Sequence, residues 1–335
     1  MVLYSVSSLL SLRLAVSGIF ISFVRMSMLG LWVGIELNFL GAICYIRGTS
    51  IDEGERRIKY FVVQVLGSCF LVIGFLISVN SFFRRIVLNI IILGVILKLG
   101  LFPFHFWVPA VISGLSWIGC FIVSTLQKAV PFWLLRNACL TPFKLGVIEI
   151  LACVTRLVGC LGGLGVLSYR VLLGYSSLVN LGVITILCCI NQFIFYFIVY
   201  RLLNLFVMFS LYKIRVFSFI DLIKDSIKRR LDVIIWISLY FFSLAGLPPF
   251  SGSVLKVNFL LNCWNFFPLG CVVCVLSSAI SLYFYTRVVL ALFIFWGKRS
   301  SKENIFNLIR FSWLRILRFI VNIAVGLIFF LSQGL

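Results

Sequence analysis

Four side chains that can gain or lose a proton lie in long apolar runs of the sequence: Glu36, Lys98, Lys128 and Lys256. A charge in hydrocarbon costs from a few to about ten kcal/mol, so an ionisable residue at that depth indicates a functional site. Burial favours the neutral form of such a group, whereas an opposite charge nearby favours the charged form. Groups held between these two tendencies can pass protons along a row if water joins them. We therefore predict a proton relay.

Each of these groups also has a structural interpretation. A lysine near the end of a span can extend its ammonium group to the membrane surface. Glu36 could act as a hydrogen-bonding partner between packed helices. His105 is the only histidine and lies between Phe104 and Phe106. We expect it to be a hydrogen-bonding residue at an interface, and we keep it as a candidate accessory site of the relay.

Prolines interrupt the helical pattern close to the lysines. Proline removes a backbone donor, and a membrane tolerates the opened ladder only where protein or water replaces the bond. Lys98 is followed by the break Gly100-Leu-Phe-Pro103, and Lys256 is preceded by the break Gly246-Leu-Pro-Pro249. Paired broken helices in two parts of a chain are typical of transporters built from repeats. The predicted helix breaks are at Pro103, Pro131, Pro248 and Pro249.

The composition determines which elements must position these groups. Hydrophobic residues make up 63% of the chain and charged residues 11%, against about 25% charged residues in soluble domains. At about 20 residues per span, the apolar runs predict about 10 or 11 transmembrane helices. The sequence lacks the alternating strands of an outer-membrane barrel. We expect an all-α polytopic membrane protein with discontinuous helices, and one transmembrane domain over residues 1–335.

The net charge of +20 arises because Asp and Glu together number only nine. A basic excess in a membrane chain favours anionic lipid as a partner, and we do not expect nucleic acid. Basic residues flank both sides of successive spans, so they leave the orientation open. The segment Lys213–Asp232 has apolar residues at helical spacing. Either an amphipathic helix on the membrane surface or an ordinary charged loop fits it.

Local patterns predict the nature of several further stretches. We predict a charged loop over Arg47–Lys59, spans over Val108–Thr125 and Gln127–Leu140, a basic loop over Lys298–Lys302 and a last span over Trp313–Leu331. The glycines between Gly159 and Gly165 follow no strand, so we interpret them as a packing face rather than a nucleotide loop. Cys271-Val-Val-Cys274 lies in an apolar span and is interpreted as packing, not as a metal site. The N-terminal segment predicts insertion without a removable targeting signal.

At the charged groups the sequence resembles a known family. The segments LKLGLFPFHFWVPAV, LQKAVPF and FSLAGLPPFSGSVLK are similar to segments of the antiporter-like membrane subunits of mitochondrial NADH:ubiquinone oxidoreductase, respiratory complex I. WVGIELNFL, IKYFVVQVLGS, LLGYSSLVNLG and LYFYTR add further matches, in order, from about Trp32 to Arg287. The segment around Glu36 favours the chain 2 subunit.

The resemblance implies specific roles. Glu36 and Lys98 correspond to the family's glutamate–lysine pair, and Lys128 and Lys256 to the following relay lysines. The chain would carry no cofactor, and NADH, FMN, iron–sulfur clusters and ubiquinone would be bound by partner subunits. Its partners would be the other membrane-arm subunits, including sibling antiporter-like chains, in the mitochondrial inner membrane. It would conduct protons when remote quinone reduction perturbs the relay.

Two departures and two alternatives remain. The family often has glutamate where Ala110 stands, and some relatives have histidine where Asn180 stands. A stand-alone cation/proton antiporter would use similar helices and lysines without redox partners. A structural subunit with no active proton path would need the helices but tolerate neutral residues at all four charged positions.

Overall fold

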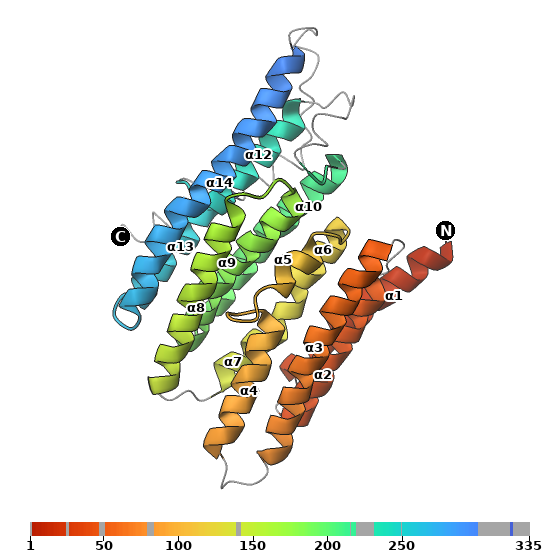
Figure 1. The fold of residues 1–335 in the computed structure, drawn as a ribbon, viewed down its shortest axis with the longest axis vertical. Coiled ribbons are helices and arrows are strands. Elements are labelled where there is room, and N and C mark those ends of the chain that lie inside the picture. The colour runs from red at the N-terminus through yellow and green to blue at the C-terminus, as the bar shows by residue number, and fades with distance from the viewer. Residues whose placement is uncertain are drawn as a thin grey trace.

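The computed structural model is a bundle of long helices that run up and down along a shared direction (Figure 1). It describes residues 2–24, 27–46, 51–78, 84–138, 142–214, 216–218, 231–248, 250–300 and 322–323. Within that part of the chain, the β-structure is limited to one isolated bridge between Ser168 and Ser218. Helices α1 to α4 lie on one side of the bundle and α12 to α14 on the other, with the remaining helices between them (Figure 1).

Apolar runs bounded by serine, glycine and proline define the elements. Ser27 begins α2 and Ser116 begins α6, and each serine side chain accepts a hydrogen bond from a backbone N–H three residues on, which is the usual N-cap interaction. The elements are α1 (Val2–Val24), α2 (Met28–Tyr45), α3 (Ile51–Ile77), α4 (Arg84–Leu99), α5 (Trp107–Ile112), α6 (Trp117–Ser124), the 3-10 turn η2 (Leu126–Lys128), α7 (Ala129–Asn137), α8 (Pro142–Gly163), α9 (Tyr169–Cys189), α10 (Phe193–Ile214), α12 (Leu231–Ala245), α13 (Ser251–Cys263) and α14 (Pro268–Ser300).

Eight segments of the described chain are long and apolar enough to cross a membrane. Two shorter apolar helices, Ile86–Leu99 and Ile234–Ala245, accompany them. The all-α polytopic membrane fold is therefore confirmed. Of the predicted last span, Trp313–Leu331, only residues 322–323 are described. Most of the Lys213–Asp232 segment also lies outside the described residues.

Two predicted loops were partly wrong. Helix α3 begins at Ile51, inside the stretch assigned as a charged loop, of which residues 47–50 are not described. Glu55 and Lys59 stabilise this polar turn as an ion pair one helical turn apart, at 2.5 Å. Helix α14 continues to Ser300 and so includes the start of the predicted basic loop. The charged residues therefore lie inside the ends of these helices rather than beyond them.

The predicted spans Val108–Thr125 and Gln127–Leu140 were wrong. Helix α5 stops at Ile112, and a new helix starts at Trp117 after the Ser116 cap. The crossing segment is instead Trp117–Asn137, made of α6, η2 and α7. The boundary between the two predicted spans therefore lies inside one broken span, because η2 interrupts the apolar run at Gln127 and Lys128 without ending it.

Small residues set the closest helix contacts. A Cβ on Gly34 of α2 would lie 2.7 Å from the Gly18 carbonyl oxygen of α1, and one on Gly182 of α9 would lie 2.5 Å from the Ala152 oxygen of α8. A Cβ on Gly159 would lie 2.9 Å from the Val179 nitrogen. Gly159 therefore packs α8 against α9, and Gly163 faces Phe284 of α14, where a Cβ would lie 3.2 Å from the ring. The interpretation of this stretch as a packing face agrees with these two contacts.

Candidate functional site

Glu36 and Lys98 form an ion pair in the interior of the bundle. Lys98 Nζ of α4 lies 3.3 Å from Glu36 Oε1 of α2, and the side chains are 2% and 23% exposed. The Phe39 ring centroid is 5.8 Å from the ammonium nitrogen. A second ion pair, between Glu55 and Lys59, is by contrast largely exposed. The structure thus brings together the first two predicted relay residues.

The end of α4 is shaped around Lys98. Gly67 of α3 provides space for the Lys98 side chain, since a Cβ on Gly67 would lie 2.7 Å from Lys98 Cγ. The Gln64 amide donates to the Lys98 carbonyl at 3.3 Å and so satisfies one of the carbonyls that a helix end leaves free. Gly100 follows with φ of +76°, a conformation that glycine adopts readily. Local sequence and α3 together end the helix directly after the lysine.

Lys128 lies at the break between α6 and α7 and is 3% exposed. Its ammonium donates to the Ser177 hydroxyl of α9 at 3.3 Å. The adjacent Gln127 points to a different helix and donates to the Asn38 carbonyl of α2 at 2.8 Å. Because both side chains are buried, Lys128 does not extend to the membrane surface, which was the structural alternative for this residue.

Lys256 lies across the second break, between α12 and α13. Its ammonium donates to the carbonyl of Ala245, the last residue of α12. A cation at this position complements the negative end of the helix dipole and a free carbonyl. Gly246 has φ of +76°, and a Cβ on it would lie 2.7 Å from Lys256 Nζ. The glycine is therefore required both for the turn and for the lysine.

The predicted prolines lie near the helix breaks, but not all of them lie at a break. Pro103 follows α4, and Pro248 follows α12. Pro131 lies in the first turn of α7, where proline is tolerated because the first N–H groups of a helix have no intrahelical partner. The break at Lys128 therefore precedes Pro131, so the prediction of a break at that proline was wrong. Pro249 lies outside the described residues.

His105 is 6% exposed and lies in the α4–α5 connection. Its ring centroid is 3.9 Å from that of Phe106 and 5.9 Å from that of Phe102. Its Nδ1 atom is buried without a hydrogen-bond partner. A hydrogen bond is therefore not seen at Nδ1, although the Pro103 backbone lies within hydrogen-bonding reach of the imidazole.

The two departures from the family pattern have clear positions. Asn180 of α9 donates to the Ser176 carbonyl and accepts from the Tyr196 hydroxyl of α10, both at 2.9 Å. The asparagine thus forms a polar link between α9 and α10, one turn beyond Ser177. Ala110 lies on the exposed side of α5.

One buried arginine, Arg156, and one partly buried arginine, Arg201, were missed by the sequence analysis. Arg156 of α8 donates to the Ser277 hydroxyl and, at 3.3 Å, to the Cys274 carbonyl of α14. Arg201 of α10 donates to the Thr125 carbonyl, at the break before Lys128. A single charge in an apolar run, the signal that identified the lysines, is present at both arginines as well.

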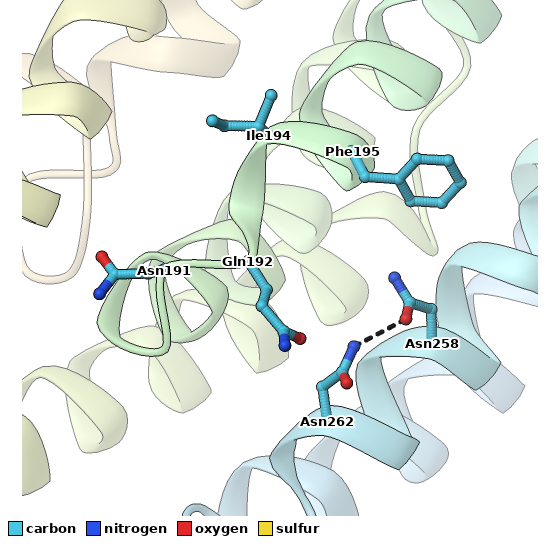
Figure 2. A pocket seen from close by; sticks show the side chains of 6 residues that line it. All are labelled: Asn191, Gln192, Ile194, Phe195, Asn258 and Asn262. Atoms are coloured by element: carbon cyan, nitrogen blue, oxygen red, sulfur yellow. Dashed lines mark hydrogen bonds between the residues drawn. The ribbon is translucent and has the colours of Figure 1, made fainter.

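Groups of histidine, cysteine and carboxylate side chains that could hold a metal ion are absent from the part of the chain that the structure describes. One open pocket of about 350 Å³ lies where the α9–α10 connection meets α13. Figure 2 shows its amide-rich lining, with Asn258 and Asn262 joined by a 2.7 Å hydrogen bond and Gln192 facing them. The pocket lies beyond Lys256 on α13 and does not include it.

Comparison with known proteins identifies the family. The family model for NADH:quinone oxidoreductase and Mrp antiporter transmembrane proteins matches residues 26–281. NADH-ubiquinone oxidoreductase chain 2 of Albinaria caerulea is 31% identical over 90% of this chain and 91% of its own length. The same subunit of Anopheles gambiae is 30% identical over 92% and 96%. The chain belongs to the NADH-ubiquinone oxidoreductase chain 2 family.

Solved structures agree on the fold. A chain of respiratory complex I from Thermus thermophilus has a TM-score of 0.78 at 21% identity, covering 96% of this chain and 78% of its own. A chain of the Mrp complex from a Dietzia species has a TM-score of 0.68 at 18% identity, covering 85% and 59%. The antiporter-like fold that the resemblance implied is therefore confirmed.

Membership in the chain 2 family answers several predictions directly. The chain is an antiporter-like membrane subunit of NADH:ubiquinone oxidoreductase, respiratory complex I. It is a multi-pass protein of the mitochondrial inner membrane, and its partners are other subunits of the complex. As a chain 2 subunit it works within an assembled enzyme.

Proposed function

We propose that this chain conducts protons across the inner membrane through a relay of Glu36, Lys98, Lys128 and Lys256. The observation that carries the proposal is the buried Glu36–Lys98 ion pair, at 3.3 Å in an apolar bundle. Each of the two later lysines lies at a helix break and bonds only to a hydroxyl or a carbonyl. Broken helices of this kind create polar, hydrated positions at membrane depth.

The electrostatics suggest how the relay responds to a remote reaction. A buried ion pair depends strongly on its partner, because removing one charge leaves the other uncompensated in a medium of low polarity. A movement of Glu36 away from Lys98 would therefore make the lysine release its proton. The proton would pass toward Lys128 and then Lys256. His105, near the α4 break, is retained as an accessory group.

The redox groups belong elsewhere in this proposal. NADH, FMN, the iron–sulfur clusters and ubiquinone would be bound by partner subunits. Sibling antiporter-like chains would be neighbours in the membrane arm, and anionic lipid would contact the basic ends of the helices. The contribution of this chain is the path of the proton.

The variant Lys98→Met tests the proposal. It replaces a buried ammonium by an apolar side chain of similar length. We expect the assembled enzyme, reconstituted in vesicles, to move fewer protons per electron pair than the unaltered enzyme. Lys59→Met is the matched control, because Lys59 is 55% exposed and pairs only with Glu55. An assembled Lys98→Met enzyme that pumps with unaltered stoichiometry would contradict the relay.

A further inference from the structure

Helix α2 contacts both the first lysine of the relay and the element that carries the second. Its Glu36 side chain pairs with Lys98 of α4 at 3.3 Å. Its Asn38 residue is hydrogen-bonded to η2, the turn that contains Lys128. Residues two apart in an α-helix point about 160° apart around the axis and are separated by about 3 Å along it. One short stretch of α2 therefore reaches toward two different relay lysines.

Three hydrogen bonds join Asn38 to η2. Gln127 Nε2 donates to the Asn38 carbonyl at 2.8 Å and to Asn38 Oδ1 at 3.1 Å. In return, Asn38 Nδ2 donates to the Leu126 carbonyl at 3.4 Å. Asn38 and Gln127 are 2% and 7% exposed, so bulk water does not compete for these bonds. We call this pair of side chains the Asn38–Gln127 link.

The chemistry of the link differs from that of ordinary helix packing. Apolar contacts are not directional, whereas a hydrogen bond weakens steeply when its angle or length changes. A buried amide that loses its partner also keeps the full cost of its burial. The link therefore fixes the register of η2 against α2, and the two elements move together.

The link holds the turn that carries Lys128. Only Leu126, Gln127 and Lys128 form η2, and the Lys128 N–H bonds to the Thr125 carbonyl at 3.3 Å. The Lys128 ammonium bonds to Ser177 of a different helix, α9, at 3.3 Å. Because Gln127 and Lys128 are adjacent in so short a turn, a shift of Gln127 moves the Lys128 backbone relative to α9.

We propose that Asn38 and Gln127 are positioning residues of the relay, and that their link transmits a displacement of α2 at the Glu36–Lys98 pair to Lys128. This inference rests on the proposed relay. A displacement that separates Glu36 from Lys98 carries Asn38 with it, because both residues belong to one helix. Lys128 consequently changes its position against Ser177 in the same movement in which Lys98 loses its carboxylate.

The test is the number of protons moved per electron pair by the assembled Gln127→Leu enzyme, reconstituted in vesicles, at equal electron flux. Leucine is similar in size to glutamine but makes no hydrogen bond, and the variant leaves all four relay residues in place. We expect the ratio to fall to that of Lys128→Met measured alongside, because Lys128 no longer follows α2. Gln192→Leu is the control, since Gln192 is an exposed glutamine between α9 and α10.

Two double variants separate positioning from packing. Asn38→Gln/Gln127→Asn keeps both amides and the combined length of the two side chains, and we expect it to recover most of the lost pumping. Asn38→Leu/Gln127→Leu leaves no unpaired amide, and the Leu126 carbonyl still accepts from the Ala129 N–H. We expect this apolar pair to assemble but to pump at the lowered ratio.

Three results would overturn the inference. The first is an unaltered ratio in Gln127→Leu or, should that variant not assemble, in the apolar pair. The second is an exchanged pair of amides that pumps no better than the apolar pair. The third is failure of the apolar pair to assemble, because the amides would then be needed for folding and not for positioning.

The Lys128→Met variant also separates this inference from the relay itself. Unaltered pumping in Lys128→Met would remove the relay, whatever the amide variants do. Reduced pumping in Lys128→Met together with an unaltered ratio in Gln127→Leu would leave the relay standing and remove the role of the link.

Discussion

The three relay lysines differ in the chemical group that stabilises their ammonium charge. Lys98 has a carboxylate, Lys128 a hydroxyl and Lys256 the carbonyl at the end of a helix. Hydroxyl and carbonyl partners stabilise an ammonium less than a carboxylate does, because they carry only partial charges. A proton moving along such a row meets sites of different affinity. Lys98 is the site whose proton affinity changes most when its partner moves by a small distance.

Glu36→Gln tests that difference at the level of one residue. Removing the carboxylate leaves Lys98 without its counter-charge, and breaking a buried ion pair in this way costs about 3–5 kcal/mol. We expect fewer protons per electron pair and less assembled enzyme on a native gel. The double variant Glu36→Gln/Lys98→Met should restore assembly but not pumping, because it leaves no unpaired charge and no relay site. Restored pumping in the double variant would contradict this reasoning.

Helix ends, more than whole helices, determine where these groups lie. The breaks after Lys98 and before Lys256 each contain a glycine with φ of +76°, Gly100 and Gly246. Each break leaves free carbonyls at the end of a half-helix, and a cation or an amide satisfies them. The element therefore supplies both the space for a buried charge and part of its stabilisation.

Gly246→Ala tests the second break. Alanine disfavours a positive φ by about 1–2 kcal/mol, and its Cβ would lie 2.7 Å from the Lys256 ammonium nitrogen, so the lysine must move. We expect a lower thermal stability of the assembled enzyme and reduced pumping. Gly146→Ala in α8 is the control, because a Cβ there meets nothing within 4 Å. Equal stability of the two variants would show that the Gly246 turn is not strained by a side chain.

The sequence predicted the helix class, the four ionisable groups and two of the breaks, because a charge in an apolar run and a Gly–Pro pair are local signals. It did not predict that α6, η2 and α7 form one broken span, since the break at Lys128 depends on contacts with α2 and α9. It also did not predict the Ser177 partner of Lys128 or the Ala245 carbonyl as the partner of Lys256, whereas the family resemblance had implied the Glu36–Lys98 pair. Ser177 lies 49 residues from Lys128 in the sequence, so only the packed bundle determines that contact.

At the scale of the whole molecule, the crossing segments differ in how much of each is buried inside the bundle. Of the crossing windows, that of α9 is 83% buried and that of α6–α7 is 78% buried, whereas that of α1 is only 22% buried. The four relay residues lie on α2, α4, η2 and α13, helices that extend from the α1–α4 side of the bundle to the α12–α14 side (Figure 1). The outer helices present apolar surface to lipid or to neighbouring subunits.

The native size of the detergent-solubilised protein checks this picture. We expect the chain to migrate with NADH dehydrogenase activity in a particle much larger than its own 38.0 kDa, because a chain 2 subunit works inside the assembled complex. A small particle without redox activity would favour a stand-alone cation/proton antiporter. An active complex that tolerates neutral residues at all four relay positions would favour a structural subunit.

The most direct measurement is the number of protons moved per electron pair by the assembled Lys98→Met enzyme, compared with Lys59→Met at equal electron flux. If protons pass through the Glu36–Lys98 pair, Lys98→Met moves fewer protons per electron pair, and Lys59→Met moves an unaltered number. Equal ratios in the two assembled enzymes would mean that protons do not pass through Lys98, and the relay would have to be abandoned.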